Sequence, residues 1–204
     1  MKHYLMVDLG TGNSRVALVD SDGGILGLRT YTNVYHRDSA YEDGQYFLPE
    51  DWAALLLQGC RELCREHPDI QVNAVSAAGA RQSFVLLDGN GRAFLGLPNI
   101  DNRGRAYMAQ VPEHDEIYRL SGKWATEDFG AAKLLGLRMQ HPEQYEAVES
   151  VLSLSEWIAW IFTGRKVMEY TQACESQLYD IGQRSWSQTL CSFYGLRPEF
   201  LPPL

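Results

Sequence analysis

The residues best suited to chemistry lie near the start of the sequence, in the segment Asp8–Arg15, which reads DLGTGNSR. Two of its glycines, Gly10 and Gly12, let the backbone turn sharply and present its N–H groups as a concave nest for anionic oxygens. Side-chain hydrogen-bond donors accompany the glycines at three positions: Thr11, Asn13 and Ser14. A loop of this composition is typical of phosphate binding.

The two charged residues at the ends of this segment extend the interpretation. Arg15 carries a planar guanidinium whose fork of N–H groups matches a phosphate. Asp8 follows an apolar run, and its carboxylate suits Mg²⁺ held through water, because Mg²⁺ takes oxygen ligands and gives up its waters reluctantly. Nest, cation and carboxylate together are the parts needed for phosphoryl transfer. The alternative is a glycine-rich turn between two strands that binds no ligand.

The same segment excludes two other phosphate-binding loops. A P-loop needs Gly-Lys-Ser/Thr at its end, and no such tripeptide follows here. The dinucleotide fingerprint needs a third glycine and a helix that starts at the loop. In this sequence Arg15–Val19 is instead an apolar run of the kind that forms a strand. The loop is therefore expected to join two strands.

Three short apolar runs must position this loop: Tyr4–Val7, Arg15–Val19 and Ile25–Thr32. Their connections are tight, and Ser21–Gly24 is a turn signal. Tight connections imply antiparallel neighbours, because a parallel pair needs a long crossover. The chain is therefore expected to open with a three-stranded meander.

The remaining sequence predicts further strands and then a helical second half. Tyr35–Phe47 is polar and is expected to be a loop, and Pro49 opens a helix that Pro68 stops. Val72–Ala78 predicts a buried strand, and Asp88–Gly91 predicts the turn of a hairpin. Later segments read as helices, with one strand at Gln177–Ile181: Asn102–Gln110, Glu113–Leu120, Gly130–Gln140, Pro142–Val148, Ser155–Phe162 and Ser187–Tyr194. The expected fold class is α/β, a mixed sheet flanked by helices.

The overall composition limits the class of protein. Of the 204 residues, 45% are hydrophobic and 22% are charged, which is ordinary for a globular chain with a full core. The net charge of −8 and the lack of a Lys/Arg cluster argue against nucleic-acid binding. No apolar run is long enough to span a bilayer, and the four cysteines lack zinc-ligand spacing. We therefore expect a cytoplasmic protein with reduced thiols and no membrane partner.

The segment Asp8–Arg15 also contains the pattern Asp-x-Gly-Thr-x-x-x-Arg inside an expected meander. This pattern resembles the first phosphate motif of the FGGY carbohydrate kinases, which belong to the actin-like, ribonuclease-H-like ATPase superfamily. Later segments resemble other parts of that family in the same order along the chain: Val75–Asp88, Asp101–Arg103, Ser121–Gly122, Lys133–Leu135, Ser155–Trp157 and Leu196–Pro202. The resemblance covers essentially the whole sequence and implies a ribonuclease-H-like α/β fold.

The resemblance implies roles for the residues of the phosphate loop. Asp8 would lie near Mg²⁺, and Arg15 would balance phosphate charge. The residues between them would face the phosphates of ATP: Gly10, Thr11, Gly12, Asn13 and Ser14. ATP and Mg²⁺ are therefore the implied cofactors.

The resemblance also implies a binding site for a small sugar or polyol. Arg81 and Gln82 fall where the family places polar sugar contacts, although Gln82 replaces a charged residue there. Asp101 would accept hydrogen bonds from sugar hydroxyls, with Arg103 orienting it, unless Asp101 only caps the helix that follows. Trp124 lies in a region that borders the sugar pocket, although a single Trp is more often part of a core.

Two departures from the family pattern leave the identity of the sugar open. Asn99 stands where the family often has Trp, and Gly136 stands where a Trp usually follows the signature Lys133. Pentuloses, hexuloses, polyols and the autoinducer-2 signal all lie within the range of substrates that the resemblance implies.

No catalytic base is identified in the sequence. The resemblance implies that the base, a second phosphate motif and the adenosine pocket belong to a second lobe, and Leu201–Leu204 resembles a linker. We therefore expect residues 1–204 to form an N-terminal lobe that has no kinase activity alone. Such a lobe can self-associate through the surface that a second lobe would cover. The alternatives are a catalytically inactive sugar-binding or regulatory domain, or a lobe of another actin-like ATPase.

Overall fold

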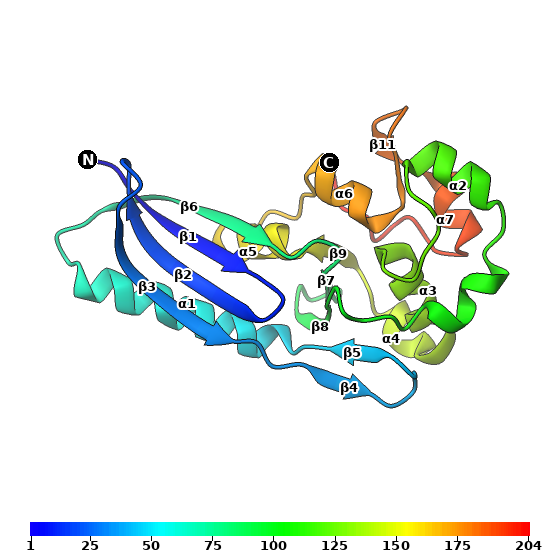
Figure 1. The fold of residues 1–204 in the computed structure, drawn as a ribbon, viewed down its shortest axis with the longest axis horizontal. Helices are drawn as coiled ribbons and strands as arrows, with labels where there is room; N and C mark the ends of the chain where they lie inside the picture. The colour runs from blue at the N-terminus through cyan, green and yellow to red at the C-terminus, as the bar shows by residue number, and fades with distance from the viewer.

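The computed structural model describes residues 1–204, and its first half is built on a four-stranded sheet (Figure 1). The strands are β1 (His3–Leu9), β2 (Asn13–Asp20), β3 (Ile25–Thr32) and β6 (Val72–Gly79), in the order β3-β2-β1-β6. β1 pairs antiparallel with β2, and β2 pairs antiparallel with β3, which confirms the expected meander. β6 pairs parallel with β1, so both strands end beside each other on the same edge.

Two helices cover one face of this sheet. Helix α1 (Pro49–Glu66) begins with Pro at its first position and carries acidic residues in its first turn, both favourable at a helix N-terminus. Helix α5 (Leu154–Thr163) lies on the same face beside β6 and β1. The two helices and the sheet share a buried apolar cluster that includes Leu5, Val7, Val16, Leu18, Trp52, Leu56, Leu63 and Trp157.

The opposite face of the sheet has no such cover. Met6 pairs with Ala17, and Ala17 pairs with Leu28, so these three side chains share the face that α1 leaves free. Met6 is 41% exposed and Leu28 is 46% exposed. Parallel strand pairs are usually buried on both faces. This face of the sheet therefore carries an exposed apolar row. Asp8 and Arg15 form the next row toward the phosphate loop.

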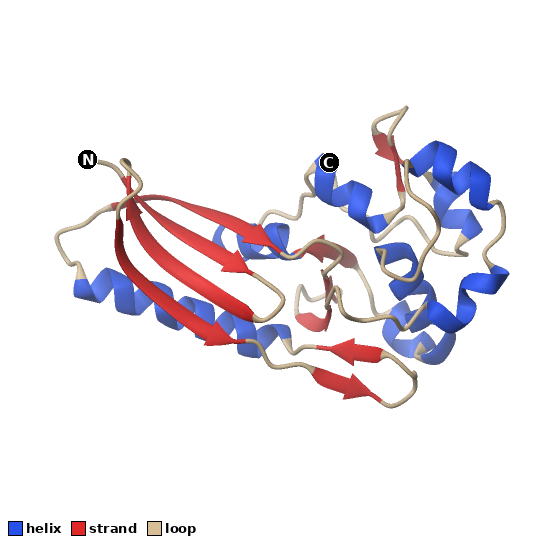
Figure 2. Cartoon of the chain, in the orientation of Figure 1, coloured by secondary structure: helices blue, strands red, loops and turns tan.

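The second half of the chain packs helices around a small antiparallel sheet, as Figure 2 shows. Strand β7 (Phe84–Leu87) lies between β8 (Ala93–Leu97) and β9 (Ser150–Ser153). All four residues of β7 are buried, and they alternate between two apolar clusters. The surrounding elements are the 3-10 helix η1 (Arg105–Gln110), α2 (His114–Ser121), α3 (Gly130–Gln140), α4 (Pro142–Glu146), α6 (Tyr170–Ser176), β10 (Tyr179–Asp180), β11 (Ser185–Trp186) and α7 (Gln188–Phe193).

Several expectations about local structure are corrected. The segment expected to be a loop is a hairpin of β4 (His36–Asp38) and β5 (Gly44–Tyr46). Gly44 is needed there, because a side chain would collide with the ring of Tyr41 at 2.7 Å. The helix expected from Asn102 starts only at Arg105 and is of the 3-10 type.

The end of the chain also differs from the expected linker. The carbonyl of Pro202 accepts a hydrogen bond from the Trp186 indole at 2.6 Å, and the carbonyl of Pro203 accepts one from the Met168 N–H at 2.9 Å. These bonds hold the last residues against the body of the protein. All four cysteines are free, with Cys60 and Cys191 buried. Among the helices, none has the length and apolar character needed to cross a membrane.

Candidate phosphate and sugar site

The phosphate loop joins the ends of β1 and β2, where the sheet places Asp8 directly opposite Arg15. The Arg15 Nη1 and Asp8 Oδ2 atoms are 3.1 Å apart, and both side chains are about half exposed on the uncovered face. The Gly10 N–H donates to the Asn13 carbonyl at 3.0 Å and closes the turn. A Cβ added to Gly12 would meet nothing within 4 Å, so the space beside the loop is open to a ligand.

Asn33, directly after β3, supports the loop through hydrogen bonds. Its Nδ2 donates to the carbonyl of Gly10 at 2.7 Å and to that of Thr11 at 3.3 Å. Its backbone N–H donates to the carbonyl of Gly12 at 3.1 Å. All three loop carbonyls are thereby satisfied by one residue. The N–H groups of Thr11 and Gly12, which lie outside both strands, have no partner in the chain. The loop therefore offers two free donors, as a phosphate nest requires.

Two further hydroxyl groups stabilise this arrangement. The Tyr35 hydroxyl donates to the Thr11 carbonyl at 2.6 Å. The Ser14 hydroxyl donates to Asn33 Oδ1 at 2.6 Å, and Ser14 is buried. This corrects the expectation that the Ser14 side chain faces a phosphate, because its hydrogen is already committed to Asn33. Neither Asn33 nor Tyr35 was identified from the sequence, since both lie beyond the motif and act only through the fold.

Arg81 and Gln82 lie directly after β6, at the edge where β1 also ends. Arg81 is exposed and forms no ion pair. Gln82 has a left-handed backbone conformation with φ of 60°, which is strained for a residue other than Gly. Such strain in a loop is typical of functional segments. Arg81 thus presents an exposed cation beside the unusual backbone of Gln82, and the sugar contacts of both residues stay a prediction.

Asn99 joins this segment to the phosphate loop. Its backbone N–H donates to the Ser83 hydroxyl at 2.9 Å. Its Nδ2 donates to the Thr11 hydroxyl at 3.0 Å, across 88 residues of sequence. The phosphate loop and the end of β6 are therefore neighbours, with Asn99 bonded to Thr11 on one side and to Ser83, directly after Gln82, on the other.

Asp101 does not lie on the surface of this site. It is fully buried, with Oδ2 accepting from Arg103 Nε at 2.8 Å and Oδ1 accepting from the Gln45 N–H at 2.8 Å. Burial raises the pKa of this carboxyl, while Arg103 and Lys133 oppose that rise. Because no part of the Asp101 side chain reaches the surface, it cannot meet a sugar hydroxyl in this structure, which corrects the expected sugar contact. Arg103 does orient Asp101, but the pair fixes the fold.

Lys133 of α3 is also fully buried, and it holds the turn that carries Asn99. Its Nζ donates to the carbonyl of Pro98 at 3.0 Å and to the carbonyl of Asp101. Burial lowers the pKa of Lys133 to about 8, against the opposing effect of the Asp101 carboxylate. This ammonium thus spans both ends of the turn, a role that the sequence did not reveal.

Trp124 lies in the connection between α2 and α3. It is 57% exposed, and its ring stacks on Tyr118 of α2 with centroids 4.4 Å apart. The Gln177 amide donates to the Trp124 carbonyl at 2.8 Å and fixes the connection. Trp124 is therefore not a core residue, and its stacking partner belongs to α2 instead of the phosphate loop or the Arg81–Gln82 segment.

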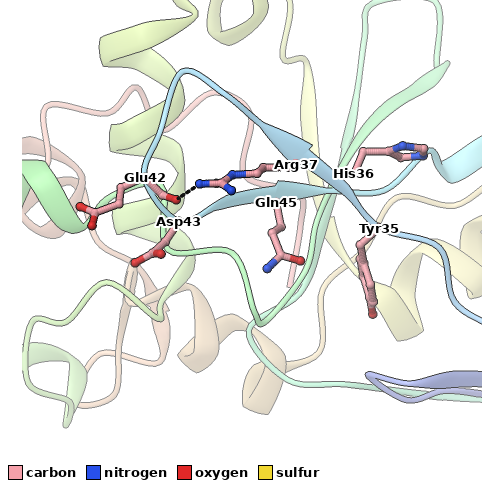
Figure 3. A pocket seen from close by; sticks show the side chains of 7 residues that line it. Tyr35, His36, Arg37, Glu42, Asp43 and Gln45 are labelled. Atoms are coloured by element: carbon pink, nitrogen blue, oxygen red, sulfur yellow. Dashed lines mark hydrogen bonds between the residues drawn. The ribbon is translucent and has the colours of Figure 1, made fainter.

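A polar hollow of about 440 Å³ lies along the β4–β5 hairpin (Figure 3). Its lining residues are Tyr35, His36, Arg37, Glu42, Asp43, Gly44 and Gln45. Arg37 donates to the Glu42 carbonyl at 3.2 Å, while Tyr35 reaches the phosphate loop through Thr11. The hollow therefore adjoins the site on the hairpin side.

The residues of the site suit Mg²⁺ only as an ion that is held largely by waters and substrate phosphates. No group of three or more His, Cys, Asp or Glu side chains is arranged to hold a metal ion. Mg²⁺ can nevertheless be held by one carboxylate together with waters and substrate phosphates. Asp8 is an exposed carboxylate beside the two free N–H donors, so it suits a water-mediated contact.

Comparison with known proteins shows the family to which the chain belongs. Residues 3–204 match the family described as the N-terminal domain of the FGGY family of carbohydrate kinases. The chain belongs to this family. Its sequence is 40% identical over 204 residues to a putative sugar kinase, YoaC, of Bacillus subtilis (strain 168), covering 100% of this chain and 42% of that protein. It is 29% identical over 213 residues to an autoinducer-2 kinase of Salmonella choleraesuis (strain SC-B67), covering 99% and 40%.

Solved structures of low sequence identity share the fold. A xylulose kinase from Brucella ovis superposes with a TM-score of 0.89 at 20% identity, over 99% of this chain and 42% of that chain. A Plasmodium falciparum glycerol kinase with ADP gives 0.87 at 16% identity, over 100% and 43%. These neighbours confirm the predicted ribonuclease-H-like α/β class. The chain spans less than half the length of the relatives that it matches.

Proposed function

We propose that this chain is the N-terminal lobe of a cytoplasmic, ATP-dependent kinase that transfers the γ-phosphoryl group of ATP to a hydroxyl of a sugar or polyol. The observation that carries the proposal is the phosphate loop. Two free N–H donors, Thr11 and Gly12, lie beside the Asp8–Arg15 pair. Through Asn99 the same loop is linked to Ser83, the residue directly after Gln82.

On the phosphate side, the residues would bind and orient the nucleotide. The Thr11 and Gly12 N–H groups would donate to phosphate oxygens, and Arg15 would offset their charge. Mg²⁺, when bound with ATP, neutralises charge that develops on the phosphates. Asp8 would hold that ion through water. Asn33 keeps the loop carbonyls turned away from the anion, because it donates to two of them.

On the sugar side, Arg81 and Gln82 would bind hydroxyl groups, since a guanidinium donates and an amide both donates and accepts. A kinase also needs a base that takes the proton of the attacking hydroxyl. Asp101, the carboxylate expected on the sugar side, is buried and cannot serve as that base. We propose that the base belongs to a second lobe of a longer polypeptide, and that closure of two lobes excludes water.

One observation favours a second candidate, a sugar-binding domain without catalysis. Arg81 is exposed, and the Asp101 carboxylate expected beside it is buried, an arrangement that suffices for binding alone. The two candidates differ in the phosphate loop, because only a kinase needs its free donors. Sugar binding without phosphate binding would therefore favour the second candidate.

The test is a nuclear magnetic resonance titration of the ¹⁵N-labelled 204-residue chain with inorganic phosphate and, separately, with a panel of pentuloses, hexuloses and polyols. Phosphate is expected to shift the amide signals of Thr11 and Gly12, and a sugar is expected to shift those of Arg81 and Gln82. Arg15→Lys, which keeps the charge and loses the planar fork, should weaken phosphate binding only. Signals that stay unchanged at both segments contradict the proposal.

The chain alone is expected to show no turnover. Incubated with ATP, Mg²⁺ and the same panel, it should release ADP no faster than a control without protein. Turnover above that control would show that the base lies within residues 1–204.

A further inference from the structure

Asn99 is the point where the two halves of the proposed site meet. Its backbone N–H is bonded to Ser83, the residue directly after Gln82, and its side chain is bonded to Thr11 of the phosphate loop. Ser83 is buried, and its hydroxyl also lies 3.5 Å from the Arg81 carbonyl. A change in the Arg81–Ser83 segment can therefore reach the phosphate loop through the side chain of Asn99, in addition to the backbone bond from the Ala80 N–H to the Leu9 carbonyl at 2.7 Å.

The backbone of the turn that carries Asn99 is held in place at both ends. Lys133, fully buried, donates to the carbonyls of Pro98 and Asp101 at the two ends of the turn. Asp101 is in turn fixed by Arg103 and by the Gln45 N–H, both at 2.8 Å. Because both ends are held, Asn99 has a fixed backbone from which its amide reaches Thr11.

The two segments that Asn99 joins differ in how firmly they are held. In the phosphate loop, the Thr11 carbonyl is bonded to Tyr35 and Asn33. In the other segment, Gln82 has a strained backbone, and Arg81 is exposed without a partner. A sugar bound at Arg81 and Gln82 would order their exposed and half-buried side chains. A phosphate that binds next to Asn99 after the sugar would then lose less conformational entropy, because the sugar has already ordered these side chains. Such a saving in entropy is a source of positive cooperativity.

We propose that Asn99 is a positioning residue that couples the two halves of the site, so that sugar and phosphate bind this chain with positive cooperativity. The inference rests on the proposed function, because it requires both ligands to bind. The Thr11 hydroxyl and the Asn99 amide are the two groups through which the coupling passes. Linkage makes the effect reciprocal: each ligand must raise the affinity for the other by the same factor.

The test is calorimetric titration of the 204-residue chain with inorganic phosphate, in the absence and in the presence of a saturating sugar found in the panel. For the unmodified chain, the dissociation constant for phosphate should fall about fivefold or more when sugar is present, the lower end for coupled sites. The reverse titration should give the same factor. Asn99→Ala and Thr11→Val should both bring this factor close to one. Thr11→Ser keeps the hydroxyl and should preserve the factor.

Each outcome decides a different point. Binding of both ligands with a factor near one in the unmodified chain overturns the coupling and leaves the proposed function intact. A factor that survives in both Asn99→Ala and Thr11→Val shows that the coupling bypasses Asn99 and overturns its role. Absence of binding for phosphate or for every sugar overturns the proposed function and the coupling together. Thermal melting of each variant, compared with Thr11→Ser, separates loss of coupling from loss of fold.

Discussion

The two carboxylates Asp8 and Asp101 show how differently the halves of the site are built. Asp8 pairs with Arg15 at 3.1 Å on an exposed sheet face, within a motif of eight consecutive residues. Asp101 pairs with Arg103 at 2.8 Å in the interior, and its other oxygen binds the hairpin at Gln45. The first pair is available to a ligand, whereas the second supports the turn behind the ligand site. Similar charge pairs are thus accessible to solvent in one half and buried within the fold in the other.

The largest expected effect comes from breaking the buried pair. Asp101→Asn leaves the buried Arg103 with Asp38, 3.8 Å away, as its remaining carboxylate partner. Breaking a buried ion pair typically costs about 3–5 kcal/mol in free energy of unfolding. The matched change Asp8→Asn, at an exposed pair, should cost less than about 1 kcal/mol. Chemical denaturation of both variants measures the difference. Equal stability losses would contradict the division between a structural and an exposed carboxylate.

Removing the support of the phosphate loop should have the next largest effect. Asn33→Ala takes away the donors to Gly10 and Thr11 and the acceptor for Ser14. We expect phosphate affinity to fall about tenfold and stability to fall by about 1–3 kcal/mol. Tyr35→Phe removes one bond to Thr11 and should have a smaller effect on both quantities. A phosphate affinity that is unchanged in Asn33→Ala would mean that the loop needs no support from β3.

The buried Lys133 should make stability depend on pH. Its pKa is lowered to about 8 in the folded chain from its ordinary value of 10.5. Between these values the unfolded chain binds more protons, so Lys133 makes stability rise with pH, by up to about 1.4 kcal/mol per pH unit. Burial raises the pKa of Cys60 and of Cys191 to about 11, which lowers stability above their ordinary value of 9.

The comparison with Lys133→Met isolates this contribution, because the two cysteines are present in both chains. The stability of the unmodified chain relative to Lys133→Met should increase from pH 8 to pH 10 and stay constant from pH 6 to pH 7. Urea denaturation across this range measures it. A difference that is flat throughout would show that Lys133 is protonated equally in both states.

The smallest effects are expected from two exposed side chains. Arg81→Ala should leave stability within about 0.5 kcal/mol and weaken sugar binding severalfold. Trp124→Ala, which removes a ring stacked on Tyr118 at 4.4 Å, should weaken sugar binding less than Arg81→Ala does. The same sugar titration compares the two variants. A larger loss of sugar affinity in Trp124→Ala than in Arg81→Ala would place the sugar pocket beside α2.

The sequence predicted the meander and helix α1, because apolar runs, tight connections and a proline mark them locally. The residues of the phosphate motif could be proposed because they are contiguous. Their binding role and that of Arg81 and Gln82 stay predictions. The sequence failed to predict features that depend on contacts between residues far apart in the chain. The sequence suggested that Asp101 is accessible to a sugar, whereas in the structure Asp101 is buried and bonded to Gln45 and Arg103. Asn33 and Lys133 act on residues 22 to 35 positions away, so no local pattern marks them.

The hairpin of β4 and β5 was missed for a related reason. Its strands are short and polar, and they pair only with each other. Asp38, at the end of β4, lies 3.2 Å from the His141 ring and within 3.8 Å of Arg103. These tertiary contacts, which the local sequence does not encode, hold the hairpin against the second half of the chain.

The central claim is that one loop of this chain binds phosphate beside a sugar segment. A crystal structure of the 204-residue chain grown with inorganic phosphate and a sugar that binds in solution tests it most directly. The account predicts phosphate oxygens within hydrogen-bond distance of the Thr11 and Gly12 N–H groups, with sugar hydroxyls at Arg81 and Gln82. Phosphate bound elsewhere, with both N–H groups still free, would contradict it.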